Sequence, residues 1–238
     1  MLLVDHLLIV LLFLVQPLFG IYESRRNNAR WRAGLPLDRV EFYRHTMIME
    51  WAFLGVLAGV WMLARRPADA LGFVAPGGTG FYVGLAVLAA LLAYLLFAWH
   101  WTRRAGASDK SGQLEKVGKV IRYLPHTRKE LRHFYAVSAT AGIVEEIVYR
   151  GFVFWYLAQF MPLWAVVVVS SLAFGFGHSY QGPAGAVRCG IVGMLFGLFY
   201  IVTGSIWLPI VAHFLLDALQ GAAIYELTRA KRQASEAG

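Results

Sequence analysis

Seven apolar segments of roughly 20 residues each restrict what this chain can fold into. They span residues 2–21, 45–64, 81–101, 133–159, 163–178, 184–202 and 206–225. A helix of that length crosses the hydrocarbon core of a bilayer, where a spanning segment must satisfy its own backbone hydrogen bonds. Charged residues make up only 15% of the chain, against about 25% in soluble domains. We therefore expect a single all-α integral membrane domain over residues 1–238, a polytopic bundle of about seven transmembrane helices.

The basic residues are gathered in three polar stretches of the chain. Of the 22 Lys and Arg, six lie in residues 23–44, nine in 102–132 and three in 226–238. Lys and Arg concentrate in the cytoplasmic loops of membrane proteins, so the net charge of +8 indicates membrane topology rather than nucleic-acid binding. We expect the N-terminus outside, the C-terminus in the cytoplasm, the lipid bilayer as a partner and no nucleic acid. Only Arg65 and Arg66, on an outer loop, depart from this pattern.

Four polar residues near the ends of the first two apolar segments are expected to lie at the lipid headgroups. Asp5 and His6 should meet lipid headgroups at the outer end of the first segment, while His45 and Glu50 should reach the cytoplasmic headgroups from the second. The first segment has no basic start, so we expect no cleaved signal peptide. The single cysteine, Cys189, cannot form an intrachain disulfide and is expected to be a small core residue.

The two parts of the chain differ in character. Residues 1–130 hold three bulky segments and a basic loop, whereas residues 131–228 hold all three clusters of intramembrane charge and many small residues. Small residues that let membrane helices approach closely include Gly175, Gly177, Gly193 and Gly197. We therefore expect residues 131–228 to form a compact core of four helices.

The first charged cluster consists of Glu145, Glu146 and Arg150. An ionised side chain in the middle of a membrane helix costs about 2.5 to 3.5 kcal/mol, so such groups face one another or a wet cavity. On a helix, Glu146 and Arg150 are i,i+4 neighbours and can pair, while Glu145 points about 100° away from Glu146. The arginine can hold one of the two carboxylates ionised, and the other carboxylate could act as a general base. A helix–helix ion pair without chemistry is the alternative.

Two further clusters lie on separate segments. Phe174 precedes His178 by one helical turn, and His213 and Asp217 share a face of the last segment. An aspartate one turn from a histidine can hold the imidazole tautomer, as a carboxylate does for a catalytic or metal-bound histidine. Three converging helices could thus gather carboxylates and imidazoles in one pocket, the raw material of a hydrolytic site. A structural ion network and the ion path of a transporter are alternatives, although we see no inverted repeat.

Together the three clusters resemble the motifs of the CPBP family, the CAAX proteases and bacteriocin-processing enzymes, also called the Abi family. That family is known by EExxxR, FxxxH and HxxxN or HxxxD on separate transmembrane helices. The matching residues here are Glu145, Glu146, Arg150, Phe174, His178, His213 and Asp217. Gly151 also matches the glycine that usually follows the arginine. The resemblance covers roughly residues 124–225 and implies an intramembrane endopeptidase.

The resemblance also implies a role for each motif residue. Glu145 would be the general base, and His178 would help to activate the attacking water. His213 and Asp217 would occupy the positions that stabilise the oxyanion. The residues that support this geometry would be Glu146, Arg150 and Phe174.

Two features leave alternatives open. The family has been described both as metalloproteases and as metal-independent glutamate proteases, and Glu145, His178 and His213 could ligate Zn²⁺ if a metal is used. These residues do not form an HExxH helix, and we favour a water activated by glutamate. The eukaryotic CAAX enzymes carry Asn where this chain has Asp217, and an ionised Asp cannot donate to an oxyanion. Asp217 must then be protonated, orient His213 or ligate a metal.

The short basic loops resemble those of a prokaryotic member in the cytoplasmic (inner) membrane. A membrane-associated protein or peptide precursor is then a better expected substrate than a prenylated CAAX protein. A non-catalytic membrane scaffold or a bacteriocin-immunity protein of the same fold is the alternative function.

Overall fold

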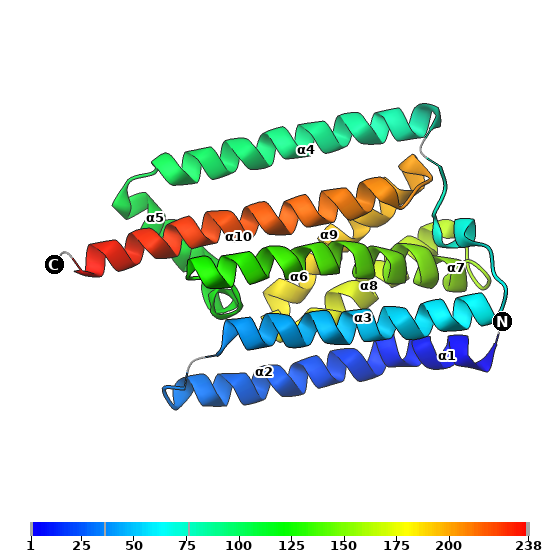
Figure 1. Ribbon diagram of the computed structural model, residues 1–238, viewed down its shortest axis with the longest axis horizontal. Helices are drawn as coiled ribbons and strands as arrows, with labels where there is room; N and C mark the ends of the chain where they lie inside the picture. The colour runs from blue at the N-terminus through cyan, green and yellow to red at the C-terminus, as the bar shows by residue number, and fades with distance from the viewer. Residues whose placement is uncertain (1, 36, 76, 237–238) are drawn as a thin grey trace.

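The computed structural model describes residues 2–35, 37–75 and 77–236, and within these ranges it contains helices and no strand (Figure 1). The α-helices are α1 Leu3–Val10, α2 Gln16–Arg32, α3 Arg39–Leu63, α4 Gly78–Arg104, α5 Ala107–Val117, α6 Arg128–Glu146, α7 Phe154–Leu157, α8 Leu163–Gly177, α9 Pro183–Thr203 and α10 Trp207–Glu236. The predicted all-α fold class is confirmed.

Among the residues that the structure describes, five helical stretches are long and apolar enough to cross a membrane. They are Leu3–Arg30, Arg39–Leu63, Gly78–Arg104, Pro183–Thr203 and Trp207–Gln233. The other two predicted segments are helical as well, but they do not meet this criterion. Helix α8 has only 15 residues, which at 1.5 Å each is shorter than a hydrocarbon core of about 30 Å. Helix α6 carries charged residues that lower its hydropathy. The expected count of about seven spans is therefore not confirmed.

The long helices run side by side, with α10 packed against both α6 and α4, α3 packed against α6, and α8 packed against α9 (Figure 1). The turn between α2 and α3, helix α5 and the C-terminal end of α10 share one end of the bundle. At this end Arg39 Nε donates to the Arg122 carbonyl over 2.8 Å, and Arg232 donates to the His126 carbonyl. The three basic stretches of the sequence therefore meet at one end of the molecule.

Helix α6 begins five residues before the predicted segment because Thr127 and Glu130 form a capping box. The Thr127 hydroxyl accepts from the Glu130 amide over 3.2 Å, and the Glu130 carboxylate accepts from the Thr127 amide over 2.9 Å. The helix then continues without interruption to Glu146. The capped start therefore marks the beginning of the helix that ends at the acidic pair, Glu145 and Glu146.

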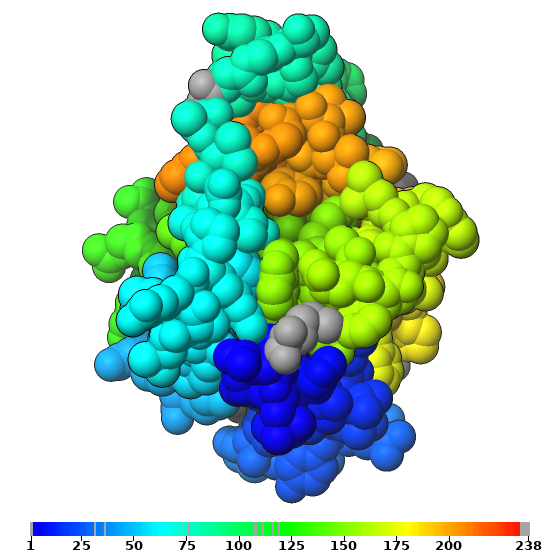
Figure 2. Space-filling model, turned by 90° about the vertical axis from the view of Figure 1, so that its right-hand side faces the viewer, coloured from blue at the N-terminus to red at the C-terminus, as the bar shows by residue number. Residues whose placement is uncertain are grey.

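An ion pair joins the N-terminal helix to the turn that follows α3. Arg66 donates through both terminal nitrogens to Asp5, over 2.8 and 2.7 Å, and the Asp5 side chain is fully buried. The guanidinium also lies 5.1 Å from the ring centre of Trp61 and 4.5 Å from that of Trp155. Such bidentate, aromatic-packed geometry suits arginine better than lysine. Figure 2 looks at this end, where the start of the chain lies against the end of α3.

The expectation that Asp5 meets lipid headgroups is wrong, because its carboxylate is enclosed by Arg66. His6 is exposed, and its Nδ1 lies 2.6 Å from the hydroxyl of Tyr156. The ion pair also accounts for one of the two arginines that departed from the charge pattern. Arg66 is neutralised within the protein, so it does not act as a free positive charge at this end.

Glycines set the close approach of α8 and α9, as predicted. A Cβ atom built on Gly175 would lie 2.6 Å from the Ala186 carbonyl oxygen and 3.0 Å from the Gly190 Cα. One built on Gly193 would lie 3.1 Å from the Phe174 ring. Because backbone atoms cannot move aside as side chains do, Gly175 fixes the spacing of the two helices just before the motif histidine of α8.

We expect Gly175→Ala to destabilise the protein by about 1 to 3 kcal/mol, because the added methyl group overpacks the contact with α9. Gly59→Ala is the matched control, since a Cβ atom there meets nothing within 4 Å and alanine is the better helix former. Thermal unfolding in detergent should show a lower midpoint for Gly175→Ala than for wild type and for Gly59→Ala. Equal midpoints for the two variants would contradict the close contact.

Candidate active site

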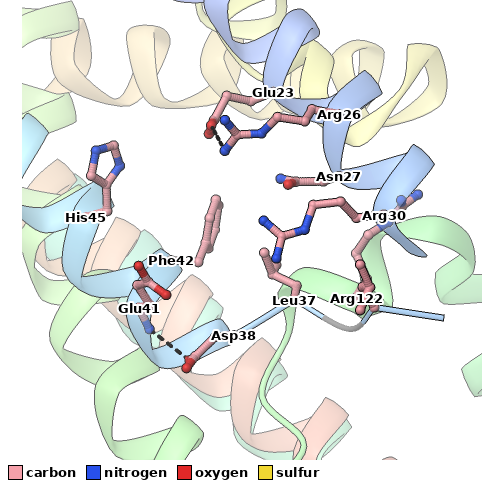
Figure 3. A pocket seen from close by; sticks show the side chains of 11 residues that line it. Glu23, Arg26, Asn27, Arg30, Leu37, Asp38, Glu41, Phe42, His45 and Arg122 are labelled. Atoms are coloured by element: carbon pink, nitrogen blue, oxygen red, sulfur yellow. Dashed lines mark hydrogen bonds and ion pairs between the residues drawn. The ribbon is translucent and has the colours of Figure 1, made fainter. Parts of the chain in front are cut away.

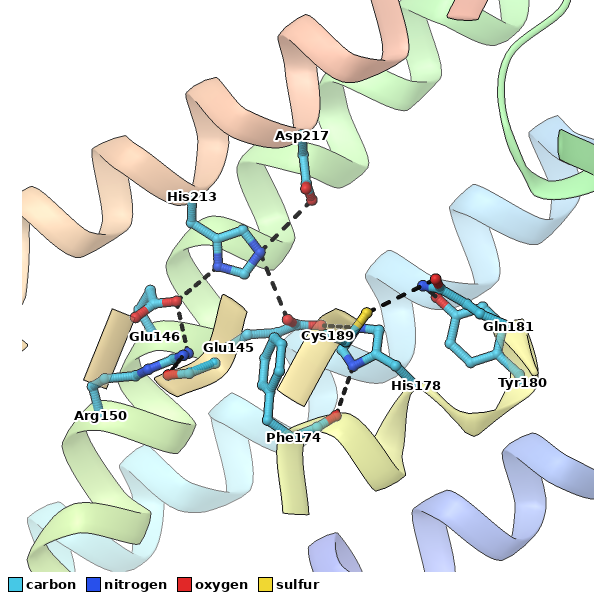
Figure 4. A network of polar contacts seen from close by, with 11 residues as sticks. Glu145, Glu146, Arg150, Phe174, His178, Tyr180, Gln181, Cys189, His213 and Asp217 are labelled. Carbon is cyan, nitrogen blue, oxygen red and sulfur yellow. Dashed lines mark hydrogen bonds and ion pairs between the residues drawn. The ribbon is translucent and has the colours of Figure 1, made fainter. Parts of the chain in front are cut away.

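The structure brings the motif residues of three helices together in one polar network (Figure 4). Its members are Glu145, Glu146, Arg150, Phe174, His178, His213 and Asp217. Glu145 and Glu146 end α6, and the chain then continues as a π-helical segment, Ile147–Val153, which is buried throughout and contains Arg150. His178 is the C-cap residue of α8, and His213 lies on α10.

Glu146 is the buried anchor of this network. Its side chain has no exposed surface, and its Oε1 accepts from Arg150 Nη1 over 2.8 Å. The same oxygen lies 2.8 Å from His213 Nδ1. A carboxylate held ionised by an arginine can only accept, so Nδ1 of His213 carries the proton and Nε2 points toward Glu145. Glu146 therefore orients His213, and Arg150 holds Glu146.

Asp217 is not positioned to orient His213 by a direct hydrogen bond. Its Oδ2 lies 3.7 Å from His213 Nε2, which exceeds hydrogen-bonding distance. The i,i+4 spacing of the two residues does place the carboxylate beside the imidazole, as the sequence suggested. The carboxylate that orients the His213 imidazole is instead that of Glu146 on α6, because the Nδ1 side of the ring faces this helix.

Arg150 is enclosed by aromatic rings as well as by acceptors. Its guanidinium lies 4.9 Å from the ring centre of Phe174 and 5.5 Å from that of Phe196. Its Nη2 donates to the Gly193 carbonyl over 3.0 Å. The Phe174 ring also lies 4.6 Å from the His178 ring, so this phenylalanine packs between the arginine and the histidine. Phe174 thereby connects the buried ion pair with the more accessible part of the site.

Glu145 and His178 face each other across a short gap. Glu145 Oε1 lies 3.9 Å from His178 Nε2, and Glu145 Oε2 lies 3.8 Å from His213 Nε2. His178 Nδ1 lies 2.8 Å from the Phe174 carbonyl, which can only accept, so neutral His178 presents a lone pair at Nε2. The gap is too long for a direct hydrogen bond and short enough for one water to contact both atoms.

The site has a buried side and an accessible side. The side chains of Glu145 and His178 are each 18% exposed and that of Asp217 is 36% exposed, whereas Glu146 and Arg150 are 0% and 2% exposed. The accessible groups can meet a water and a substrate, while the buried pair can only hold other residues in place. This division matches the chemistry of a supported hydrolytic site.

The expected ligand set for a metal does not fit the observed positions. In the part of the chain that the structure describes, no group of three or more His, Cys, Asp or Glu side chains is placed to hold a metal ion. Ligand atoms of tetrahedral Zn²⁺ lie roughly 3.4 Å apart. The separations of Glu145 from His178 and His213 are wider, at 3.9 and 3.8 Å. In this arrangement Glu145, His178 and His213 are not placed to bind Zn²⁺ together.

Sequence reasoning missed residues that border this network. Glu50 on α3 was expected to reach headgroups, but its Oε2 is buried without a hydrogen-bonding partner among the described residues. Tyr180 and Gln181 follow His178 in the next turn, and Gln181 Oε1 lies 3.8 Å from the sulfur of Cys189 (Figure 4). The free-energy cost of a charged side chain inside the membrane applies to Glu50 as it does to Glu145. This cost could have indicated that Glu50 is buried within the bundle.

A separate pocket opens between α2 and α3 at the basic end of the bundle (Figure 3). Its volume is about 280 Å³, and charged groups of both signs line it, including Arg26, Arg30 and Glu41. Its lining shares no residue with the polar network of Figure 4. The pocket is therefore separate from the candidate active site.

Comparison with known proteins gave one match. The family model described as Type II CAAX prenyl endopeptidase Rce1-like matches residues 127–219. That range contains every motif residue from Glu145 to Asp217. Neither the curated proteins nor the solved structures gave a match.

Proposed function

The chain belongs, through residues 127–219, to the CPBP family of CAAX-protease-like membrane proteins, and from this premise we propose that it is an intramembrane endopeptidase. It hydrolyses a peptide bond of a membrane-associated protein or peptide precursor. The observation that carries the proposal is the 3.9 Å gap between Glu145 Oε1 and His178 Nε2, since both atoms are acceptors that can hold one water.

In the proposed reaction Glu145 is the general base. A water held between Glu145 and His178 attacks the carbonyl carbon of the substrate, and its proton passes to the Glu145 carboxylate. A carbon–oxygen bond forms as the carbonyl becomes a tetrahedral oxyanion. When the intermediate collapses, the carbon–nitrogen bond breaks and the proton on Glu145 passes to the leaving amine. The products are a carboxylic acid and an amine.

His213 is the proposed donor to the oxyanion. For that role Nε2 must carry a proton in addition to the one on Nδ1, so His213 acts as an imidazolium. Glu146 accepts from Nδ1, and the Asp217 carboxylate lies 3.7 Å from Nε2. Both carboxylates favour a positive charge on the ring between them. In this scheme Asp217 stabilises the charge on His213 instead of contacting the oxyanion itself.

The protein is an integral membrane protein, and its substrate meets it within or beside the bilayer. We propose that the basic end of the bundle faces the cytoplasm, which puts the N-terminus outside. We also propose that the membrane is the cytoplasmic membrane of a prokaryote. The substrate is then a membrane-anchored segment that presents an extended peptide to the accessible side of Glu145 and His178.

The proposal is tested by comparing the cleaved protein termini of membranes that contain wild-type protein or Glu145→Ala. Fragments found only with wild type would support a peptidase and would identify its substrates. Identical termini in both membranes would overturn the proposal and leave a non-catalytic scaffold or immunity protein as the function.

Removal of metal ions is expected to leave cleavage intact, because the proposed water is activated by Glu145 and His178. The measurement adds a chelator to purified protein and follows the rate of cutting of a peptide recovered from the comparison above. A chelator-treated sample that is dialysed against Zn²⁺ serves as the control. Loss of cleavage with the chelator and its return with Zn²⁺ would replace the proposed mechanism with a metal-dependent one.

A further inference from the structure

His178 lies where α8 ends, so the helix that carries it does not by itself fix the direction of its imidazole. The backbone of His178 has left the helical conformation, with φ −92° and ψ 12°, and the next residues, Ser179–Gln181, form a single 3₁₀ turn. Within α8 the ring has one hydrogen bond, from Nδ1 to the Phe174 carbonyl over 2.8 Å. This bond fixes one atom of the ring, and the tilt of the ring about that atom decides where Nε2 points.

Two aromatic rings flank the His178 imidazole and limit this tilt. The centre of the Phe174 ring lies 4.6 Å from that of the imidazole, with 38° between the planes. The centre of the Tyr180 ring lies 5.9 Å away, with 35° between the planes. Both distances fall in the range in which aromatic rings attract each other. Figure 4 shows the two rings on opposite sides of the imidazole. Phe174 belongs to the motifs of the sequence, whereas Tyr180 lies outside them.

Tyr180 is itself held at its backbone, its ring and its hydroxyl group. Ser24 Oγ on α2 donates to the Tyr180 carbonyl over 2.9 Å. The ring of Tyr123, at the end of the 3₁₀ segment Gly118–Tyr123, meets the Tyr180 ring edge to face at 5.5 Å and 87°. The Tyr180 hydroxyl accepts from Gln181 Nε2 over 3.3 Å. Ser24 and Tyr123 both precede residue 127, so the part of the chain before the family match reaches the site through Tyr180.

Gln181 is in turn fixed against α9. The Cys189 thiol lies 3.8 Å from Gln181 Oε1, to which it donates. A Cβ atom built on Gly185 would lie 2.5 Å from the Cβ of Gln181, so the backbone of α9 closely approaches this side chain. The hydroxyl end of Tyr180 is therefore anchored to α9, while its carbonyl is anchored to α2. A tyrosine held at both ends can act as a rigid wall beside the imidazole.

We propose that Tyr180 is a positioning residue whose ring holds the His178 imidazole in the orientation that directs Nε2 toward Glu145. It acts through His178 and not on the substrate. The water of the proposed reaction needs both acceptors at once, and the 3.9 Å gap between Glu145 Oε1 and His178 Nε2 exists only in this orientation. The role in cleavage rests on the proposed peptidase function, whereas the fixed orientation of the imidazole can be measured without any cleavage.

The first test measures the orientation of His178 directly. Protein labelled with ¹⁵N-histidine is studied by NMR in detergent, and the signals of His178 are identified by their loss in His178→Gln. Wild type should show one tautomer, with the proton on Nδ1. Tyr180→Leu removes the ring and should give signals averaged between the two tautomers, because the imidazole can then turn away from the Phe174 carbonyl. Tyr180→Phe keeps the ring and should resemble wild type.

The second test measures kcat and KM separately, on a peptide whose cleavage depends on Glu145. We expect Tyr180→Leu to lower kcat roughly 3- to 10-fold, the effect of losing one aromatic pair, and to leave KM nearly unchanged. Tyr180→Phe should keep most of the activity, since it loses only the bond from Gln181. The matched control is Tyr94→Leu, which removes a tyrosine of α4 that is 66% exposed and should leave kcat unchanged.

Other outcomes overturn the inference in distinguishable ways. A single Nδ1-protonated tautomer in Tyr180→Leu would reject Tyr180 as the residue that orients His178, whether or not cleavage is found. Averaged tautomers with an unchanged kcat would reject its role in cleavage and leave the peptidase function standing. A rise in KM alone would assign Tyr180 to substrate binding. An absence of any cleavage that depends on Glu145 would reject the peptidase function, and the part of this inference that concerns cleavage with it.

Discussion

Glu145→Gln is expected to lower the rate of peptide cleavage roughly 100- to 10,000-fold, the usual worth of a general base. The amide has nearly the shape of the carboxylate, so contacts with His178 and His213 at 3.9 and 3.8 Å are geometrically retained. It cannot accept the proton of the attacking water, however, and that step is then lost. The rate is measured with purified protein in detergent or nanodiscs, on a peptide recovered from cleaved membrane proteins.

Two controls separate chemistry from folding in this experiment. Thermal unfolding of Glu145→Gln should match that of wild type, since the carboxylate of Glu145 makes no hydrogen bond within the described chain through its buried Oε2. Glu41→Gln should cleave at the wild-type rate, because Glu41 lies at the basic end of α3. A rate for Glu145→Gln within a factor of ten of wild type would remove Glu145 from the role of base.

Arg150→Met is expected to cause the largest loss of stability, about 3 to 5 kcal/mol, because it removes the arginine that is paired with a fully buried carboxylate. The Glu146 side chain is 0% exposed and has Arg150 as its ion-pair partner at 2.8 Å. The double variant Arg150→Met/Glu146→Gln should recover much of this loss, since the amide carries no charge and can still accept from His213. The free energy of unfolding in detergent measures both effects.

The control for this pair is Arg25→Met, which removes an exposed arginine and should leave stability unchanged. If the double variant is no more stable than Arg150→Met, the lost stability comes from another source. That source would be the packing of the guanidinium against Phe174 and Phe196, at 4.9 and 5.5 Å. The double variant therefore distinguishes an unpaired charge from lost aromatic contacts.

The helical class and the convergence of the three clusters could be predicted because both follow from the cost of polar groups in lipid. Long apolar segments must form helices, and the charged residues within them must face one another. The partner of each group could not be predicted. His213 and Asp217 share a helix face, yet it is Glu146 on α6 that lies 2.8 Å from the imidazole. That choice depends on how α6 and α10 are rotated against each other, which the spacing within one helix does not specify.

The predicted surroundings of two other acidic residues are wrong, one because a helix begins earlier than predicted and one because of a contact between distant residues. Helix α3 begins at Arg39 and not at residue 45, so Glu50 lies deeper in the bundle than its place in the apolar segment suggested. Asp5 pairs with Arg66, 61 residues away, on a stretch that hydropathy assigned only to an outer loop. Hydropathy places a residue along the membrane normal but says nothing about which side chain it meets across the bundle.

The π-helical segment after Glu146 changes which side of the helix faces each neighbour. A π turn holds one more residue than an α turn, so Ile147–Val153 turns the part that follows by about 100° relative to an uninterrupted α-helix. Before the segment, α6 meets α3 and α10, and after it Phe154 packs against Tyr200 on α9. The two parts of one continuous helix therefore pack against two different sets of neighbours. Removal of a single residue from the segment would leave either the acidic pair or α7 facing the wrong side.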